Sequence, residues 1–431
     1  MNTPNNNTQR PLNELIAELK DAVQAGDRNR AVQLEQLILQ RLAAEAYEIQ
    51  NTERTVHALM EQLDKPEPVV AKPQSRFSLT GELGGVSEQP RSLYNKIQVD
   101  PSSDAVIYPV WFGTNRKPNA QGDGYTGERH EHITRGRVDV RVPTAHRFGE
   151  TGTAFWKRLL RFDIRDDRLR LQRIETLERD GFFSGIHEAM EAARENGEQS
   201  QALFFLHGFN VSFEEAAIRA AQIGYDLKVP GATAFFSWPS RGTVTAYPVD
   251  EASIEASEGA ITNFLVDFAE NCKADKIHVI AHSMGNRGLL RALQRIAANA
   301  ETRGRVKFGQ IFLAAPDVDR DLFLDLASLY PEHAERTTLY ASNSDLPVHA
   351  SSKLHDAPRA GYFTPYTVAS SIDTVAVPNF NIDLLGHSYF AQAEALLHDI
   401  YDLMRHNEPP AKRQRIEAAV YEGKDFWSLK R

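Results

Sequence analysis

The segment IHVIAHSMGN (residues 277–286) places Ser283 directly after a run typical of a buried strand and directly before a helical pattern, MGNRGLLRALQRIAA. A sharp strand-to-helix turn strains its central residue, so the neighbours must be small, as Ala281 and Gly285 are. The start of a helix also favours negative charge that develops nearby. These features favour a nucleophilic serine over a small residue that merely relieves crowding. The pentad alone is weak, because small-x-Ser-x-Gly occurs by chance roughly 0.3 times in such a chain.

A serine hydroxyl becomes a good nucleophile only when a base, commonly a histidine oriented by a carboxylate, removes its proton. His387 follows the strand-like run DTVAV, and Asp345 follows TTLYAS. The order Ser, Asp, His is the one that an alternating strand-helix topology permits. We therefore predict a triad of Ser283, Asp345 and His387. Asp317 and Asp319, after IFLAAP, compete for the orienting role, and each residue also has a structural interpretation as a turn former or a helix cap.

A tetrahedral oxyanion requires preorganised N–H donors. The segment FFLHGFN ends a predicted strand upstream of the serine, and His207-Gly208 allows a tight backbone turn there. We expect the backbone amides of Phe209 and Met284 to form the oxyanion hole. The alternative interpretation of His207-Gly208 is an ordinary turn.

Three side chains are predicted to bind substrate: His207, Trp238 in FSWPSRG, and Arg287. For Trp238, core packing is the favoured alternative. The loop 346–372 is long for a compact domain and is typical of a binding loop or partial lid. Its cationic residues, with Arg287, could select an anionic acyl or phosphate-bearing substrate, but a solvated face is favoured; they are His349, Lys353, His355 and Arg359.

Short apolar runs alternate with amphipathic helical patterns from about residue 105 onward. Such alternation predicts an α/β fold with a mostly parallel sheet covered by helices on both faces, and reactive groups beyond the carboxyl ends of the strands. AVIYPVWFG and GRVDVRV are expected to pair like a hairpin at one edge. The expected helices are 213–227, 251–271, 284–298, 322–329 and 388–404.

Four regions divide the chain. Residues 1–63 have a helical period broken at Gly26-Asp27, which predicts a helical hairpin that packs on the parent domain or on another subunit. Residues 64–104 are rich in Pro, Gly and Ser and are predicted to be a linker. Residues 105–405 form the α/β domain, and the polar tail 406–431 is expected to lie loose or to wrap the surface.

Composition excludes several classes of protein. The net charge of −9 argues against nucleic acid as the main partner. Cys272 is the only cysteine, so no internal disulfide forms and a reducing compartment is expected. We find no signal-peptide pattern and no run of 18 apolar residues. The sequence predicts a cytoplasmic protein without a transmembrane segment.

The sequence predicts no cofactor and no metal. His130 and His132 in ERHEHITRG share one strand face, but no third ligand is in view. Neither a strand-following G-x-G-x-x-G nor a Walker A motif occurs.

The chain resembles the α/β-hydrolase superfamily and, within it, a bacterial family of uncharacterised serine hydrolases catalogued as a domain of unknown function. The resemblance covers about residues 105–405 and rests on VWFGTNRKP, GRVDVRVPTAHRFGE, LHGFNVSFEEAAIRAAQIGYDL, FSWPSRG, IHVIAHSMGNRGLLRAL, FLAAPDVDRDLF and YASNSDLPVHASSKLH. It implies Ser283 as nucleophile, Asp345 as acid and His387 as base. It also implies esterase- or lipase-like hydrolysis, and it names no natural substrate.

The sequence thus predicts a metal-independent serine hydrolase that cleaves an ester-type bond in a small-molecule or lipid-like substrate. Two alternatives stay open because a fold does not determine function. The α/β domain could be a scaffold for a protein that binds a partner or assembles through residues 1–63. The acyl-enzyme could also pass its acyl group to an acceptor other than water, which would make the protein a transferase.

Overall fold

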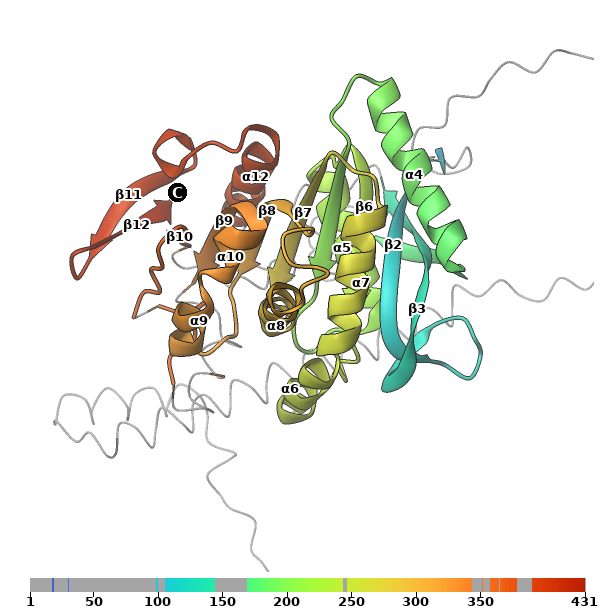
Figure 1. Cartoon of the computed structure of the whole chain (residues 1–431), viewed down its shortest axis with the longest axis horizontal. Coiled ribbons are helices and arrows are strands. Elements are labelled where there is room, and N and C mark those ends of the chain that lie inside the picture. Colours follow the sequence, from blue (N-terminus) through green and yellow to red (C-terminus); the bar gives the residue numbers. More distant parts are fainter. Residues whose placement is uncertain are drawn as a thin grey trace, which may run out of the picture. The chain divides into compact units, whose positions relative to one another are not determined.

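The structure is a computed structural model that describes residues 105–143, 169–242, 246–342, 357–363, 365–377 and 390–430, with Glu18, Arg30, Gln98, Val99 and Ser351. Within these residues one twelve-stranded sheet forms (Figure 1). Its strands are β1 (Gln98–Val99), β2 (Ala105–Pro118), β3 (Tyr125–Pro143), β4 (Arg170–Thr176), β5 (Gln201–Leu206), β6 (Gly231–Ser237), β7 (Lys276–His282), β8 (Phe308–Ala314), β9 (Ala334–Ala341), β10 (Asp373–Ala376), β11 (Ile416–Tyr421) and β12 (Lys424–Leu429).

The strand order is β11-β12-β10-β9-β8-β7-β5-β6-β2-β3-β4, and β1 pairs with β2. The run from β2 to β12 through the centre of the sheet is parallel, whereas β2–β3, β3–β4, β11–β12 and β1–β2 are antiparallel. The predicted mostly parallel sheet is therefore confirmed, as is the antiparallel pairing of AVIYPVWFG with GRVDVRV. The predicted edge position is wrong, because β4 lies outside β3.

Helices cover both faces of this sheet (Figure 1). One face buries its apolar residues against α4 (Arg179–Glu195), α6 (Tyr247–Ala256), α7 (Glu258–Asn271), α8 (Gly285–Ala298), α9 (Arg320–Leu326) and α10 (Leu329–His333). The other face packs against α5 (Phe213–Asp226) and α12 (Phe390–His406). Because they are covered on both faces, β5, β6 and β8 are buried along their whole length.

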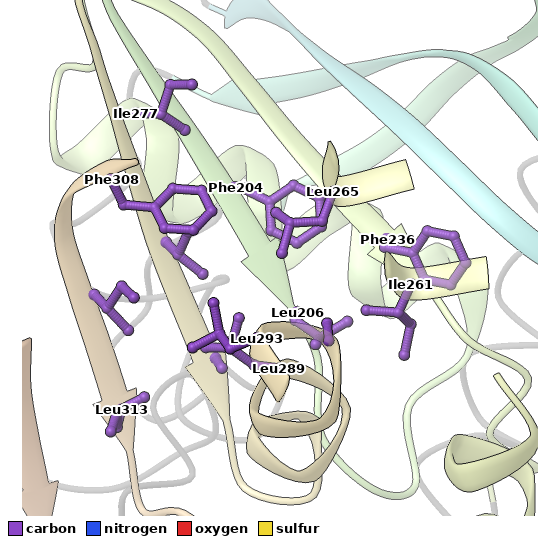
Figure 2. Packing of buried hydrophobic residues seen from close by; sticks show 14 of the residues in the cluster. Phe204, Leu206, Phe236, Ile261, Leu265, Ile277, Leu289, Leu293, Phe308 and Leu313 are labelled. Atoms are coloured by element: carbon purple, nitrogen blue, oxygen red, sulfur yellow. The ribbon is translucent and has the colours of Figure 1, made fainter. Parts of the chain in front are cut away.

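The core beneath α8 fixes the orientation of that helix. Leu289 and Leu293 point from α8 toward the strands, where Leu206 of β5 lies close by, and Phe204 of β5 lies beside Leu265 (Figure 2). These leucines are completely buried. Burying a leucine side chain stabilises a fold by about 1.5–3 kcal/mol, so this seam holds the start of α8 against the end of β5.

One predicted helix is two helices in the structure. The pattern over 251–271 predicts continuity, but α6 ends at Ala256 and α7 begins at Glu258. At the break, the Ser257 hydroxyl donates to the Ser253 carbonyl oxygen over 2.7 Å and accepts from Asn115 Nδ2 over 3.0 Å. A contact from β2 thus fixes a break that local sequence does not reveal.

The expected loose tail is wrong for the described residues after His406. A short 3-10 helix (Pro410–Lys412) leads into β11 and β12, and β12 pairs in parallel with β10. The hairpin turn, Glu422-Gly423, has positive φ at both residues (50° and 74°), which is the geometry of a two-residue hairpin turn. The structure also adds β4 and α4, which the sequence expectations do not include.

Most of the predicted linker and of the predicted helical arm lies outside the described residues; Gln98 and Val99, the described residues of 64–104, form β1 of the sheet. Within residues 1–63 only Glu18 and Arg30 are described; both are helical and form an ion pair of 3.1 Å. No helix in the described ranges is long and apolar enough to cross a membrane.

Candidate active site

The carboxyl ends of β5 and β7 meet where the chain changes direction across the sheet. The chain leaves β5 toward β6 on one side and returns to β7 on the other. Ligands of open α/β sheets bind in the crevice at such a switch point. The segments HGFN and Ser283 follow these two strands.

Ser283 occupies the turn between β7 and α8 with φ of +49°, a left-handed geometry that is unusual for a residue with a side chain. The turn requires glycine two residues later. A Cβ at Gly285 would lie 2.5 Å from the His207 carbonyl oxygen and 2.6 Å from that of Leu206. The expectation of a strained turn with small neighbours therefore agrees with the observed backbone, and Ser283 is 6% exposed.

Hydrogen bonds hold the backbone of this turn on every side. The Ser283 N–H donates to the Ala314 carbonyl oxygen over 2.9 Å, and the Ser283 carbonyl oxygen accepts from the amides of Asn286 and Asp317, each over 3.1 Å. The completely buried Asn286 side chain donates to the Ala281 carbonyl oxygen over 3.1 Å. Sequence reasoning missed Asn286, whose signal is an amide on the otherwise apolar face of α8.

The loop after β5 lies against the turn that holds Ser283. A Cβ at Gly208 would lie 2.9 Å from Ser283 Cβ, so only glycine permits this approach without displacement. The amides of Phe209 and Met284, the predicted oxyanion donors, flank this contact in sequence. Within the described part of the chain, neither amide has a hydrogen-bond acceptor. Two unengaged N–H groups beside a serine are a suitable start for an oxyanion hole.

A buried carboxylate holds the far end of the same loop. Asp250 of α6 accepts from the Asn210 amide over 3.3 Å, from the Ser240 hydroxyl over 2.5 Å and from the Arg241 amide over 2.8 Å. The Ser240 hydroxyl oxygen in turn accepts from the Val211 amide over 3.1 Å. Asn210 has φ of +57° and is thus fixed in a strained conformation.

Arg116 of β2 binds the loop from the other side. Its Nη2 donates to the Val211 carbonyl oxygen over 2.7 Å and its Nη1 to that of Ser240 over 2.9 Å. Burial lowers the pKa of Arg116 to about 10, against opposing carboxylates including Asp250. The guanidinium therefore stays charged at neutral pH. Burial likewise raises the pKa of Asp250 above its usual value, although its hydrogen bonds oppose this shift.

His207 and Trp238, both predicted to bind substrate, are covered by protein. His207 is 1% exposed and Trp238 0%. Their rings stack at 5.0 Å, and Trp238 Nε1 donates to the His207 carbonyl oxygen over 2.9 Å. Burial, together with the charge of Arg116, holds the pKa of His207 well below its usual range. This neutral, stacked pair favours the packing interpretation of Trp238.

Arg287, the third predicted substrate-binding residue, is engaged by protein groups. Its Nε donates to the Asp317 carbonyl oxygen over 2.6 Å, its Nη2 to the Tyr247 hydroxyl over 2.9 Å, and its Nη1 to Glu251. The Tyr247 ring packs edge-on against Phe209 at 5.2 Å. Arg287 therefore joins α8 to the loop after β5 through Tyr247.

The two competing carboxylates have structural partners. The Asp317 side chain accepts from the Tyr247 hydroxyl over 2.5 Å and from the Ser351 hydroxyl over 2.6 Å. Asp319 caps α9, where its Oδ1 accepts from the amides of Asp321 and Leu322. These contacts occupy the carboxylates that sequence reasoning weighed against Asp345.

Several predicted residues lie outside the described part of the chain: Asp345, His387, His349, Lys353 and His355. In the sequence Asp345 comes four residues after the end of β9, and His387 three residues before α12. His130 and His132 are exposed neighbours on β3, with ring centroids 5.8 Å apart. Among the described residues, no group of three or more His, Cys, Asp or Glu side chains could hold a metal ion.

Part of the chain matches the model of a known protein family. A family model described as "Alpha/beta hydrolase of unknown function (DUF900)" matches residues 186–405, about half of the chain. An uncharacterized protein of a Nostoc strain is 33% identical over 105 residues, a match that spans 20% of this chain and 27% of that protein.

Two solved structures show a distant likeness. An uncharacterized protein of Bacillus cereus has a TM-score of 0.32 at 14% identity, covering 49% of this chain and 61% of that one. The phospholipase PlaB of Legionella pneumophila has a TM-score of 0.28 at 10% identity, covering 53% and 68%. These scores are too low to carry an argument about function.

Proposed function

Because the chain belongs to the DUF900 family of α/β-hydrolases of unknown function, we propose that it is a serine hydrolase that cleaves an ester-type bond through an acyl-enzyme. The observation that carries this proposal is the approach of Gly208 to Ser283, where an added Cβ would lie 2.9 Å from Ser283 Cβ. This approach brings unengaged amides beside a strained serine at a helix N-terminus. A serine that served only to connect a strand to a helix would need neither feature.

His387, oriented by Asp345, is the proposed base. Asp345 follows β9 and His387 follows β10 in the sequence, so both come after strands parallel to β7. Loops at the carboxyl ends of parallel strands gather at one edge of a sheet. This arrangement supports the assignment.

In the proposed reaction, His387 takes the proton of the Ser283 hydroxyl while the serine oxygen attacks the ester carbonyl carbon. The amides of Phe209 and Met284 stabilise the resulting oxyanion. The C–O bond to the alcohol breaks, and His387 returns its proton to that alcohol. Water, deprotonated by His387, then attacks the acyl-enzyme and releases the acid and free Ser283.

Fluorophosphonate labelling of the purified full chain tests the proposal, with the modified peptide located by mass spectrometry. We expect an adduct on Ser283 that is absent in Ser283→Ala and strongly reduced in His387→Ala. His406→Ala, which removes an exposed histidine from the end of α12, is the matched control and should label like the native protein. An adduct on another serine, or none on a folded protein, would refute the proposal.

A further inference from the structure

A pocket of about 180 Å³ lies between α6, α8 and α9, and Ser283 is not among the residues that line it. Its apolar wall consists of Ile254, Leu290, Val318 and Leu322. Charged side chains stand around it, and Arg359 contributes to the lining. Such a combination of apolar wall and few polar groups is typical of small-molecule sites.

Most charged groups around this pocket have partners within the protein. Arg287 pairs with Glu251, and Arg291 pairs with Glu258 over 3.7 Å. Asp319 accepts two backbone N–H groups at the start of α9. These side chains therefore have little capacity left for a ligand.

Arg359 differs from Arg287 and Arg291, the other arginines of the lining. It is 3% exposed, so the expected solvated face is wrong for this residue. Its Nε and Nη2 have no hydrogen-bond partner within the described part of the chain. Nε lies 3.6 Å from Asp317 Oδ1, but that carboxylate already accepts from Tyr247 and Ser351. Leaving buried guanidinium donors unmatched costs more than an ordinary hydrogen bond contributes, so an additional acceptor would stabilise this side chain.

We propose that this pocket binds a carboxylate on a short apolar chain and that Arg359 holds the carboxylate. A guanidinium presents a planar fork of donors that matches a carboxylate. The apolar wall suits the chain. A volume of about 180 Å³ is the space that roughly six water molecules occupy in the liquid, and it leaves room for a chain of about four or five carbons.

Two sources could supply such a carboxylate: the distal end of the ester substrate or a separate small molecule. The pocket is connected to the nucleophile turn by Asp317, which contacts Arg359 through its side chain and Ser283 through its backbone amide. Both sources share the same chemistry at Arg359, so binding can be tested before the source is known. The proposal does not depend on catalysis by Ser283.

Titration calorimetry of the full chain with pentanoate tests the site, and pentan-1-ol provides the same chain without the carboxylate. We expect pentanoate to bind and pentan-1-ol to bind at least about tenfold more weakly, because a charge-assisted hydrogen bond is lost. Arg359→Met should weaken pentanoate binding by at least about tenfold. Arg305→Met, an exposed arginine paired with Glu270 outside the pocket, should change it less than about twofold.

A second variant guards against misfolding of Arg359→Met. Leu322→Phe enlarges a half-buried wall residue of α9 and leaves Arg359 in place. It should also weaken pentanoate binding while thermal unfolding stays near that of the native protein. The proposal is overturned if pentanoate does not bind the native chain, or if Arg291→Met abolishes binding and Arg359→Met does not.

Fluorophosphonate labelling of Ser283 with and without saturating pentanoate distinguishes the two possible sources of the carboxylate, the distal end of the substrate and a separate small molecule. If the pocket receives the distal end of the substrate, a fluorophosphonate with an ω-carboxyalkyl chain should label faster than its alkyl analogue, and pentanoate should abolish that preference. If the pocket binds a separate molecule, both probes should label at the same rate. Either result is compatible with the site, because binding itself is measured independently.

Discussion

The backbone amide of Asp317 donates to the carbonyl oxygen of Ser283 over 3.1 Å, so the loop after β8 holds the turn between β7 and α8 directly. The Asp317 side chain points its oxygens at Tyr247, Ser351 and two guanidinium groups. Asp317 thus acts on the serine through its backbone and serves with its carboxylate as the centre of a buried polar network. This division of roles separates it from a carboxylate that orients a histidine.

Asp345→Asn and Asp317→Asn should therefore have different consequences. If Asp345 orients His387, Asp345→Asn should slow fluorophosphonate labelling of Ser283 by about a thousandfold or more at unchanged stability. The reason is that asparagine no longer holds the imidazole in the tautomer that accepts the serine proton. Asp317→Asn should lower the unfolding free energy by about 3–5 kcal/mol, because Arg287 and Arg359 lose a buried counter-charge. Labelling rate and urea unfolding of both variants check this. Equal labelling loss in folded Asp317→Asn and none in Asp345→Asn would reverse the assignment.

Gly208→Ala should reduce labelling of Ser283 by about a hundredfold, because the added methyl group displaces the loop that carries the Phe209 amide. The control is Gly181→Ala in α4, where an added Cβ meets no atom within 4 Å. That change should label normally and stabilise the protein by about 0.5–1 kcal/mol, since alanine is the better helix former. Native labelling in Gly208→Ala would show that the loop does not contribute a donor.

Asp250→Asn tests whether the hydrogen-bond network at Asn210 and Val211 positions the loop that carries the proposed oxyanion donor Phe209. An amide cannot accept all the hydrogen bonds that the carboxylate takes from Asn210, Ser240 and Arg241. We expect slower labelling of Ser283 by about tenfold, with little change in the affinity for a reversible inhibitor, because the donor and not the pocket is displaced. Asp250→Glu should also label Ser283 more slowly than the native protein does. An unchanged labelling rate in Asp250→Asn would show that this network does not contribute to the reaction.

The sequence predicted the parts of the site that depend on local pattern. Ser283 lies between a strand-like run and a helical pattern, and the Gly208 turn comes just after a strand, so hydrophobic periodicity and turn chemistry locate both. Asn286, Arg116 and Asp250 were missed because their roles arise from contacts between distant segments; Arg116 and Val211, for example, are 95 residues apart in the chain. Burial likewise decides between interpretations of Trp238 and Arg359 that composition leaves open.

The C-terminal hairpin was missed for a different reason. AVYEGKDFW places glycine in a two-residue turn between two short runs, but neither run alternates apolar and polar residues as a clear hairpin signal would. The missing alternation concealed the hairpin: β11 is an edge strand whose exposed side chains include the apolar Ala418 and Val420.

His278 should make stability depend on pH. This residue of β7 is 1% exposed, both ring nitrogens lack partners in the described part of the chain, and burial lowers its pKa to about 3. In the unfolded chain its pKa is about 6.5, so between these values only the unfolded state binds the proton. Stability should therefore fall as pH decreases below about 6.5, by up to about 1.4 kcal/mol per pH unit from this group.

The comparison for His278 is urea unfolding of the native protein and His278→Leu between about pH 4.5 and 7.5. We expect the unfolding free energy of His278→Leu to fall less steeply with decreasing pH than that of the native protein. The variant should therefore become more stable relative to the native protein as pH falls. His130→Leu, which removes an exposed histidine of β3, controls for the loss of a histidine as such. Parallel curves for native protein and His278→Leu would contradict the prediction.

Arg413 should hold the C-terminal hairpin to the domain. Its side chain and that of Asp399 in α12 are each 1% exposed; Arg413 Nε donates to Asp399 Oδ1 over 2.9 Å, and the Tyr340 hydroxyl donates to Oδ2 over 2.7 Å. Arg413→Met leaves a buried carboxylate with fewer partners and should lower the unfolding free energy by about 3–5 kcal/mol. Because the cost comes from the unpaired charge, Arg413→Met with Asp399→Leu should recover much of it. Urea unfolding of the single and double variants measures this coupling. Additive losses would instead mean that Arg413 stabilises the hairpin through packing alone.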